Sequence, residues 1–214
     1  MIGYEHPPSA PAPGRRRTLV LASSSPYRRA LLERLRLPFH AVAPDIDERP
    51  RAGETPPALV QRLARAKATA LAPAWPDALV IGSDQVAVNA GRILGKPGDH
   101  ASACAQLRAA SGREVSFPTG LCVLDTATGR SRTEVVTTTV LFRPLDDATI
   151  GAYLAAEEPY DCAGSFKVEG LGIALFERVT SDDPSALTGL PLIGLTTLLA
   201  AFDYAVLAAL PGRR

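Results

Sequence analysis

The sequence contains few of the residues that form covalent cross-links or metal cages. Its three cysteines, Cys104, Cys122 and Cys162, stand far apart in 214 residues, and none belongs to a CxxC pair or has a histidine beside it. An odd number of scattered cysteines argues against both a disulfide framework and a structural zinc site. We therefore expect reduced thiols, as in a protein of the cytoplasm.

Strong charge of one sign, clustered histidines and long apolar runs are absent as well. Lys and Arg number 23 against 22 Asp and Glu, so neither nucleic acid nor an anionic membrane is expected as the main partner. No apolar run approaches the roughly 20 residues of a membrane span. The three histidines are scattered, and no Ser-His-Asp or Cys-His arrangement can be argued from them. A small charged metabolite fits this composition better.

The order of apolar and polar residues predicts an α/β fold. Residues 1–17, rich in Pro and Arg, are expected to be a disordered extension, and residues 207–214 a C-terminal tail. Between them, 18–206 alternates strand-like and helix-like stretches, as in a single α/β domain. Strands 114–124 and 132–142 are expected to form a hairpin-like insert. The other expected elements are strands at 18–22, 78–82 and 172–178, and helices at 26–36, 56–72, 99–110, 146–157 and 191–202.

The run from Ser23 to Arg29 places two cations at the start of a helix, where negative charge is preferred. Ser25 is typical of an N-cap, and the proline after it of a first helical residue. Arg28 and Arg29 then lie in the first turn, where they cost stability unless an anion binds. This strand–turn–helix therefore indicates a phosphate site. The alternative is that Arg29 pairs with Glu33 and Arg28 is solvated.

Two later segments place polar side chains among apolar ones. Lys67 falls on the apolar face of the helix expected at 56–72, so it either extends to the rim or reaches into a polar cleft. Strand 78–82 leads into Ser83-Asp84-Gln85, at the carboxyl end of a buried strand, where open α/β sheets bind ligands. Asp84 is the first candidate for catalysis. Its alternative role is to cap a turn.

An acidic loop and a lysine loop complete the candidates. Asp45, Asp47 and Glu48 offer the oxygen ligands that Mg²⁺ prefers, although most acidic loops are simply solvated. Lys96, in Gly95-Lys96-Pro97, can contact phosphate as a point charge. This loop is not a P-loop, because the spacing of its glycines is too short and Pro97 stands where Ser or Thr is required.

Taken together, these residues resemble the Maf family of nucleoside triphosphate pyrophosphatases, from about residue 18 to 200. The resemblance implies a mixed twisted sheet flanked by helices, in two lobes with a nucleotide cleft between them. It also implies a cytoplasmic enzyme, commonly a homodimer, that uses a divalent metal (Mg, Mn or Co) to split a nucleotide into its monophosphate and pyrophosphate. The matching segments are 19–29, Asp47-Glu48, Ala66-Lys67-Ala68, Gly82-Ser83-Asp84-Gln85, Gly95-Lys96-Pro97, 163–170 and Gly189-Leu190-Pro191.

The resemblance implies roles for six residues at the phosphates. Asp84 would be the proton acceptor that activates water, or would bind the metal, and the sequence does not separate these two roles. Glu48 would be a metal ligand. The positions expected to hold phosphate are Ser23, Arg28, Lys67 and Lys96.

Three positions divide the family by substrate, and here they are Tyr27, Gln85 and Glu169. Gln85 and Glu169 resemble the branch that acts on 7-methyl-GTP, whereas that branch often has Trp where this chain has Tyr27. The alternatives are a dTTP/UTP or broad modified-nucleotide pyrophosphatase and, in another class, a nucleotide-binding regulator of cell division without turnover. A retained acidic pair, Glu48 and Asp84, favours an enzyme, because a binder has no need of activated water.

Overall fold

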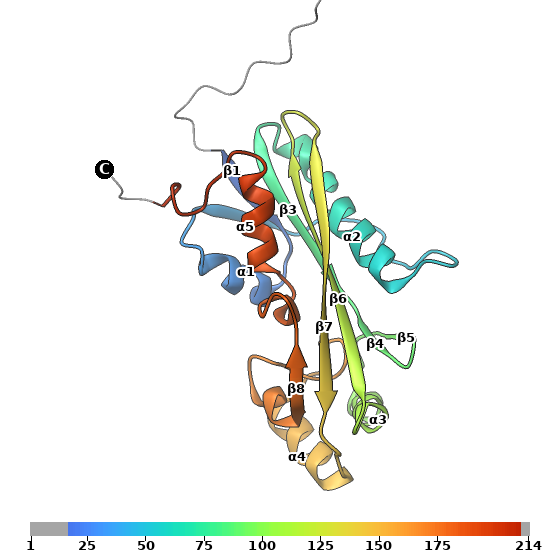
Figure 1. Ribbon diagram of the computed structural model, residues 1–214. Helices are drawn as coiled ribbons and strands as arrows, with labels where there is room; N and C mark the ends of the chain where they lie inside the picture. The colour runs from blue at the N-terminus through green and yellow to red at the C-terminus, as the bar shows by residue number, and fades with distance from the viewer. Residues whose placement is uncertain (1–16, 211–214) are drawn as a thin grey trace, which may run out of the picture.

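An eight-stranded mixed sheet forms the centre of the computed structural model, which describes residues 17–210 (Figure 1). Its strands follow the order β2-β1-β3-β6-β4-β5, and β7 and β8 continue the sheet from β6. The strands are β1 (Thr18–Ala22), β2 (Phe39–Val42), β3 (Ala78–Gln85), β4 (Ala87–Asn89), β5 (Arg92–Leu94), β6 (Glu114–Asp125), β7 (Ser131–Phe142) and β8 (Phe176–Thr180). The helices are α1 (Pro26–Glu33), α2 (Pro56–Ala70), α3 (His100–Ala110), α4 (Asp147–Glu157) and α5 (Leu192–Ala200), with short 3₁₀ turns η1 (Ala72–Ala74), η2 (Leu171–Leu175) and η3 (Ala186–Thr188).

The strands β1, β2 and β3 are parallel, because helices carry the chain back between them. From β3 onward the pairing with β6, β7 and β8 is antiparallel. Figure 1 shows β6 and β7 running the length of the molecule, with α1, α2 and α5 at one end and α3 and α4 at the other. The molecule therefore has two lobes that share these two strands.

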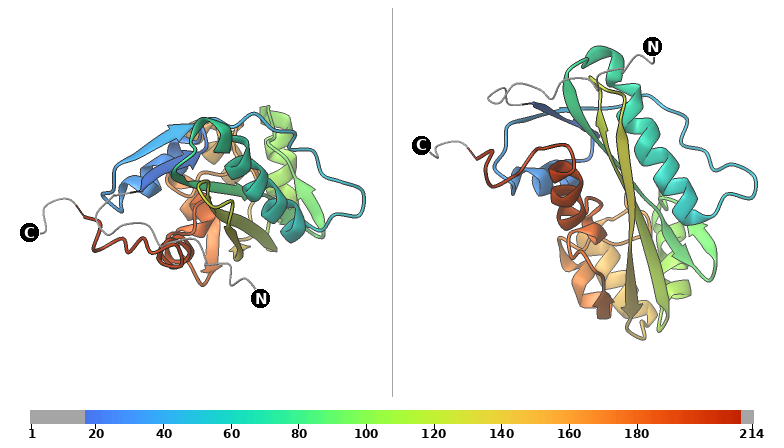
Figure 2. Two further views of the ribbon diagram at one scale, coloured as in Figure 1. Left: turned by 90° about the horizontal axis from the view of Figure 1, so that it is seen from above. Right: turned by 45° about the horizontal axis from the view of Figure 1, so that its top comes forward.

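The side chains of β1 point alternately to the two faces of the sheet, and each face packs against its own helices. Leu19 and Leu21 pack with α1 and α5, while Val20 and Ala22 pack with α2 on the opposite face. Successive side chains of a strand point to opposite faces, so an unbroken apolar strand such as β1 needs helices on both sides. Figure 2 shows α2 and α5 on opposite sides of the sheet.

Aromatic rings fill the core of the second lobe. Phe166 packs edge-on against Phe117, Phe142 and Phe176, with ring centroids 4.9 to 5.8 Å apart. Edge-to-face contacts at this distance are favourable beyond the area that they bury. Apolar residues of α3 and α4 close over this cluster. Because Phe166 follows directly on segment 161–165, the core fixes that segment against the sheet.

The helix α2 approaches the sheet unusually closely at two glycines. A Cβ on Gly82 would collide with the carbonyl oxygen of Ala64, and one on Gly120 would collide with that of Val60. Backbone contact at this range leaves room for hydrogen alone. These glycines therefore set the height of α2 above β3 and β6, and with it the reach of every α2 side chain toward the sheet.

Several expected elements are confirmed, and others need correction. The expected strand at 172–178 is wrong. Gly172 folds back to donate to the Lys167 carbonyl, so the chain forms η2 first and pairs only from Phe176. The first helix ends at Glu33, because Arg36 takes a left-handed conformation (φ 55°). The 114–142 hairpin is confirmed, but it forms the central strands rather than an insert. Strands β2, β4 and β5 were not expected.

Both ends of the predicted domain also need correction. Arg17, assigned to the extension, donates to the Asp125 carboxylate and lies 3.4 Å from the Asp77 carboxylate, so it belongs to the fold. Ala209 and Leu210, assigned to the tail, pack against the core of the first lobe. Residues 1–16 and 211–214, the rest of the two predicted tails, lie outside the described residues.

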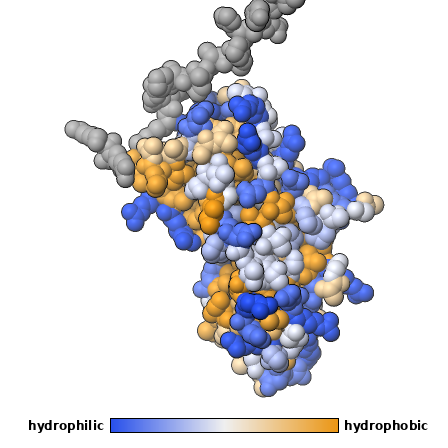
Figure 3. All heavy atoms as spheres, viewed as in Figure 1, coloured by the Kyte–Doolittle hydropathy of each residue, from blue (hydrophilic) through white to orange (hydrophobic). Residues whose placement is uncertain are grey.

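The surface carries apolar side chains in separate groups. On the face seen in Figure 3 they gather over the end of the molecule that holds α5 and over the end that holds β8, with polar residues between. The larger exposed ones are Ile93, Leu171, Ile173, Val179, Ile193 and Leu207. Among residues 17–210, no helix is both long enough and apolar enough to span a membrane.

We expect Gly82→Ala to destabilise the fold, because the added methyl group would collide with the backbone of α2. The urea midpoint should fall by an amount equivalent to about 1–3 kcal/mol, the usual cost of overpacking. Gly151→Ala is the matched control, since its methyl group would meet nothing within 4 Å in α4 and should stabilise the helix slightly. Equal midpoints for the two variants would show that α2 tolerates displacement from the sheet.

Candidate active site

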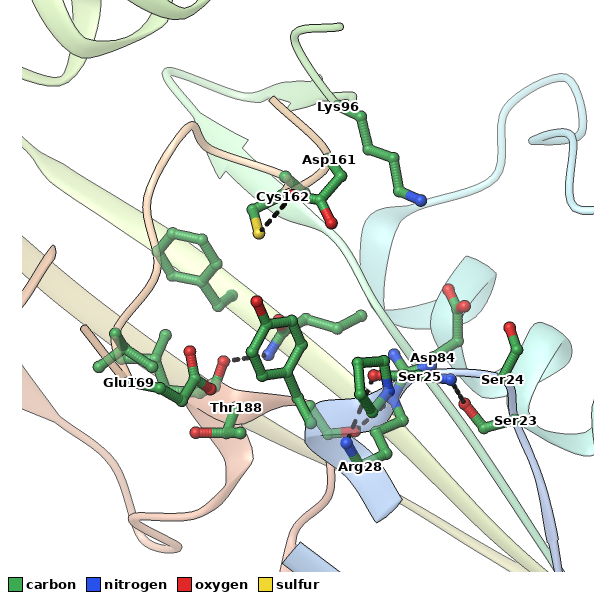
Figure 4. A pocket seen from close by; sticks show the side chains of 18 of the residues that line it. Ser23, Ser24, Ser25, Arg28, Asp84, Lys96, Asp161, Cys162, Glu169 and Thr188 are labelled. Carbon is green, nitrogen blue, oxygen red and sulfur yellow. Dashed lines mark hydrogen bonds between the residues drawn. The ribbon is translucent and has the colours of Figure 1, made fainter. Parts of the chain in front are cut away.

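A cavity of about 450 Å³ lies between the two lobes, and the predicted site residues converge on it (Figure 4). Its walls come from the β1–α1 turn, α2, the end of β3, the loop before α3, segment 161–169 and the turn after η3. Figure 4 shows Ser23 and Asp84 at one side and Glu169 at the other. We call the part formed by Ser23, Arg28, Lys67 and Asp84 the serine end. The part formed by Tyr27, Phe117, Phe166 and Glu169 is the aromatic end.

The β1–α1 turn has the predicted capped geometry. The hydroxyl of Ser25 accepts from the backbone N–H of Arg28 at 3.3 Å, and that of Ser23 accepts from the N–H of Ser25 at 3.1 Å. The two arginines have different roles. Arg29 is exposed and pairs with Glu33 at 3.2 Å, as the alternative interpretation proposed, whereas Arg28 lines the cavity.

The end of β3 distributes its side chains to two faces. Gly82 and Asp84 face α2, whereas Ser83 faces the turn that follows η3 and Gln85 faces η3 itself. This division follows from the alternation of side chains along a strand. Asp84 is only 6% exposed, and its Oδ1 lies 2.6 Å from the Nζ of Lys67. Lys67 therefore reaches into the polar pocket rather than extending to the rim.

Lys67 contacts a second carboxylate as well, with its Nζ 2.9 Å from Oε1 of Glu48. Burial raises the pKa of Asp84, and the positive charges of Lys67 and Arg28 oppose that effect. The result is a carboxyl group with a raised pKa, which as a carboxylate is a stronger base than an ordinary aspartate. A buried carboxylate of this kind, in the wall of a cavity, is suited to accept a proton from water.

The turn after η3 fixes Arg28. Its Nε donates to the carbonyl of Gly189 at 2.8 Å, and the hydroxyl of Ser83 lies 2.8 Å from the same oxygen. Gly189 has a φ of 103°, and a Cβ there would lie 3.1 Å from the Arg28 Nε, so glycine suits the position on both grounds. The Asp183 carboxylate anchors the turn by accepting from the backbone N–H of Ile193, at the start of α5.

The acidic loop supplies one residue to the cavity. Asp47 is exposed and binds Arg49, which lowers the pKa of the Asp47 carboxyl to about 2. Asp45 is exposed and lies outside the cavity wall. Glu48 alone of the three acidic residues lines the cavity. The loop therefore offers the site one carboxylate.

The donors at the serine end fit a divalent cation only in part. Glu48 and Asp84 converge on one point, the Lys67 ammonium, so one ion could reach both carboxylates. Within residues 17–210, no three His, Cys, Asp or Glu side chains gather as a metal cage of their own. A pair of carboxylates without further protein ligands is a common site for Mg²⁺, which substrate phosphates and water then help to hold.

The predicted specificity positions also reach the cavity. The Gln85 amide nitrogen lies 2.8 Å from the hydroxyl of Thr119 and 2.8 Å from the carbonyl of Ala186, which holds the amide in one orientation. Tyr27, in the first turn of α1, lines the cavity as well. Burial raises its pKa, and the negative charges of Asp161 and Glu169 add to the effect.

Lys96 is exposed at the mouth of the cavity, on the same side as Asp161 (Figure 4). Its loop is fastened to the second lobe through Gln106, which donates to the carbonyl of Gly95 at 3.1 Å and accepts from the hydroxyl of Ser165 at 2.7 Å. All nine predicted site positions therefore line one cavity, and the roles assigned to them stay predictions.

Asp161, Cys162, Thr188 and Gly189 are among the cavity-wall residues to which sequence reasoning assigned no role. Gly189 was part of a matching segment, but its contact with Arg28 joins positions 161 residues apart and leaves no local pattern. Asp161 and Cys162 precede a segment recognised only from Ala163 onward. Burial raises the pKa of the Cys162 thiol to about 12, so this cysteine is held as a thiol.

Comparison with known proteins supplies independent findings. The profile of the family "Maf-like protein" matches residues 18–202. The chain is 58% identical over 190 residues to the 7-methyl-GTP pyrophosphatase of Ralstonia nicotianae, covering 89% of this chain and 98% of that protein. It is 59% identical over 184 residues to the protein of the same name from Bordetella avium, covering 86% and 92%. The solved structure of a HAM1 protein from Coxiella burnetii covers 87% of this chain and is itself covered completely, at 16% identity and a TM-score of 0.47.

We expect Lys67→Met to destabilise the protein at neutral pH, because it leaves the buried Asp84 carboxylate without its ion pair. Removing one partner of such a pair costs about 3–5 kcal/mol. Without Lys67 the folded-state pKa of Asp84 rises further above its unfolded value, so the loss should be greatest above the folded pKa and shrink as the pH falls toward about 4. Denaturant unfolding at several pH values measures this.

The double variant Lys67→Met/Asp84→Asn is the control for that prediction. It removes the uncompensated charge and should recover much of the stability at neutral pH. If the single variant lost the same stability at every pH, or the double variant recovered none, the ion pair would not be the cause.

Proposed function

Because the chain belongs to the Maf-like protein family, we propose that it hydrolyses 7-methyl-GTP to 7-methyl-GMP and pyrophosphate. The observation that carries the proposal is the single cavity that joins two kinds of site. One end holds the buried carboxylate of Asp84 beside Lys67 and Arg28, and the other end pairs an aromatic ring, Tyr27, with the carboxylate of Glu169. The names of relatives at 56–59% identity favour the same substrate.

Each residue of the serine end has a separate role in the proposed hydrolysis. Water splits the bridge between the α- and β-phosphates, one of its protons passes to the Asp84 carboxylate, and pyrophosphate leaves. Arg28, held by the Gly189 carbonyl, and Lys67 neutralise the negative charge that grows on the leaving group. Ser23 offers a hydroxyl to the phosphates, and Lys96 adds a cation from the rim. Charges fixed in a cavity are effective because they need no reorganisation during the reaction.

Three further properties implied by the resemblance stay proposals. A divalent cation (Mg, Mn or Co) would be held by Glu48, and by Asp84 in its alternative role. When bound it would supply positive charge that polarises the phosphates. We also propose a homodimer in the cytoplasm, which light scattering on the purified protein and fractionation of cells would test.

The aromatic end suits a methylated guanine. Methylation at N7 gives the purine a positive charge, so the Tyr27 ring can add cation–π attraction to ordinary stacking. Glu169 can accept hydrogen bonds from the N1–H and the exocyclic amino group while opposing that charge. Gln85, whose amide nitrogen is bound by the protein, presents its oxygen as the free acceptor.

We expect Asp84→Asn to lower kcat for 7-methyl-GTP by roughly 10²-fold or more, the usual loss when a general base is removed. The substitution keeps the size of the side chain and removes its basicity. Pyrophosphate release at saturating nucleotide and metal is the measurement. Asp45→Asn, an exposed position outside the cavity, should leave kcat unchanged. A kcat near that of the wild type for Asp84→Asn would refute its role as the base.

Substrate choice is tested with ordinary and methylated nucleotides, including dTTP and UTP. We expect 7-methyl-GTP to give the highest kcat/KM, and Glu169→Gln to lower that value more than the value for GTP, by about 10-fold for a hydrogen-bonded charge. Glu177→Gln, on the exposed face of β8, is the matched control. Preference for dTTP or UTP would replace the proposed substrate, and binding without pyrophosphate release would indicate a regulator.

A further inference from the structure

Near the aromatic end, the cavity wall carries a further carboxylate, Asp161, which is not one of the three positions that divide the family by substrate. Asp161 begins the segment 161–169 on the upper side of the cavity in Figure 4, and Glu169 ends it at the left. Both side chains line the same cavity, and Tyr27 lies within the field of both. The base of a bound nucleotide would therefore meet two carboxylates.

The negative charge of Asp161 contributes little to the stability of the fold. The side chain is exposed, and its hydrogen-bond partner is a weak one, the Cys162 thiol at 3.4 Å. Among residues 17–210, no Lys or Arg forms a salt bridge with it. Lys96 lies on the same side of the cavity, with its side chain extending toward the serine end (Figure 4).

Negative charge also dominates around this wall. Asp161 and Glu169 both raise the pKa of the Tyr27 phenol and of the Cys162 thiol, after burial itself. Lys167 opposes them at Cys162, but its ammonium donates to the carbonyl of Glu157 and the residue does not line the cavity. The cations Arg28 and Lys67 lie at the serine end, where a backbone carbonyl holds the first and two carboxylates hold the second. The cavity is thus polarised, with cations where phosphates would bind and carboxylates where the base would bind.

We propose that Asp161 is a second specificity-determining residue, which favours a positively charged purine over its neutral parent by charge rather than by a hydrogen bond to one edge. This inference rests on the proposed function. Both carboxylates are exposed, and the proposed roles differ in mechanism: Glu169 accepts hydrogen bonds from the base, whereas Asp161 acts through space and does not depend on a fixed hydrogen-bond geometry. Its contribution is therefore sensitive to salt, which screens exposed charges.

The test measures equilibrium binding of 7-methyl-GMP and of GMP to the full chain by calorimetry. Asp161→Asn should reduce the preference for the methylated nucleotide by about threefold to tenfold at low salt, the scale expected for one charge near a partly exposed cation. The reduction should shrink at high salt. Asp161→Glu keeps the charge and should keep the preference, and Asp182→Asn, exposed outside the cavity, is the control.

Two failures are distinguishable. If wild-type protein releases pyrophosphate from 7-methyl-GTP, yet Asp161→Asn leaves the preference unchanged or weakens both ligands equally at every salt concentration, the inference about Asp161 is wrong and the proposed function stands. If wild-type protein releases no pyrophosphate from 7-methyl-GTP, the proposed function fails and this inference fails with it.

Discussion

The backbone contact between α2 and the sheet is the constraint on which the site depends. At Gly82 and Gly120 the helix rests directly on β3 and β6, with no side chain between. Lys67 follows Leu63 by one helical turn on the buried face of α2. Only at that height can its ammonium lie 2.6 Å from the carboxylate of Asp84. A larger residue at either glycine would lift the helix and withdraw the ammonium from the carboxylate.

The charges of the serine end are stabilised by one another rather than by water. Lys67 and Asp84 are each 6% exposed, and a buried charge of either sign is costly unless it is paired. Arg28 is fixed from another direction, by a carbonyl that belongs to the turn after η3. Three distant segments therefore have to be in place before any one of these charges is stable in the cavity. The site is assembled by the same contacts that complete the first lobe.

Local patterns predicted much of this fold and most of the site. The N-cap at Ser25, the apolar stripe of α2 and the polar end of β3 each depend on a few neighbouring residues, so the sequence is sufficient to find them. The short strands β4 and β5 were missed because three residues carry too little periodicity. Segment 172–178 was misassigned, because its apolar residues suit a strand and a 3₁₀ turn equally well. The hydrogen bond from Gly172 to the Lys167 carbonyl selects the turn in the first part of the segment.

Long-range contacts account for the rest. Whether Lys67 extended to the rim or reached the cavity depended on the height of α2, which no spacing of residues within the helix encodes. The role of Gly189 depends on Arg28, and the place of Arg17 in the fold depends on Asp125, more than a hundred residues away in each case. Such partners become neighbours only after the sheet has formed.

The two lobes share β6 and β7 as unbroken strands, paired from Glu114 to Leu124. Domains joined by a flexible linker can swing apart, but here any such swing would have to bend a continuous ladder of hydrogen bonds. The cleft between the lobes therefore has a constant width, which the twist of β6 and β7 sets. That width limits the size of the nucleotide that can enter. Any change of shape on binding falls to the loops at the mouth of the cleft, such as the one that carries Lys96.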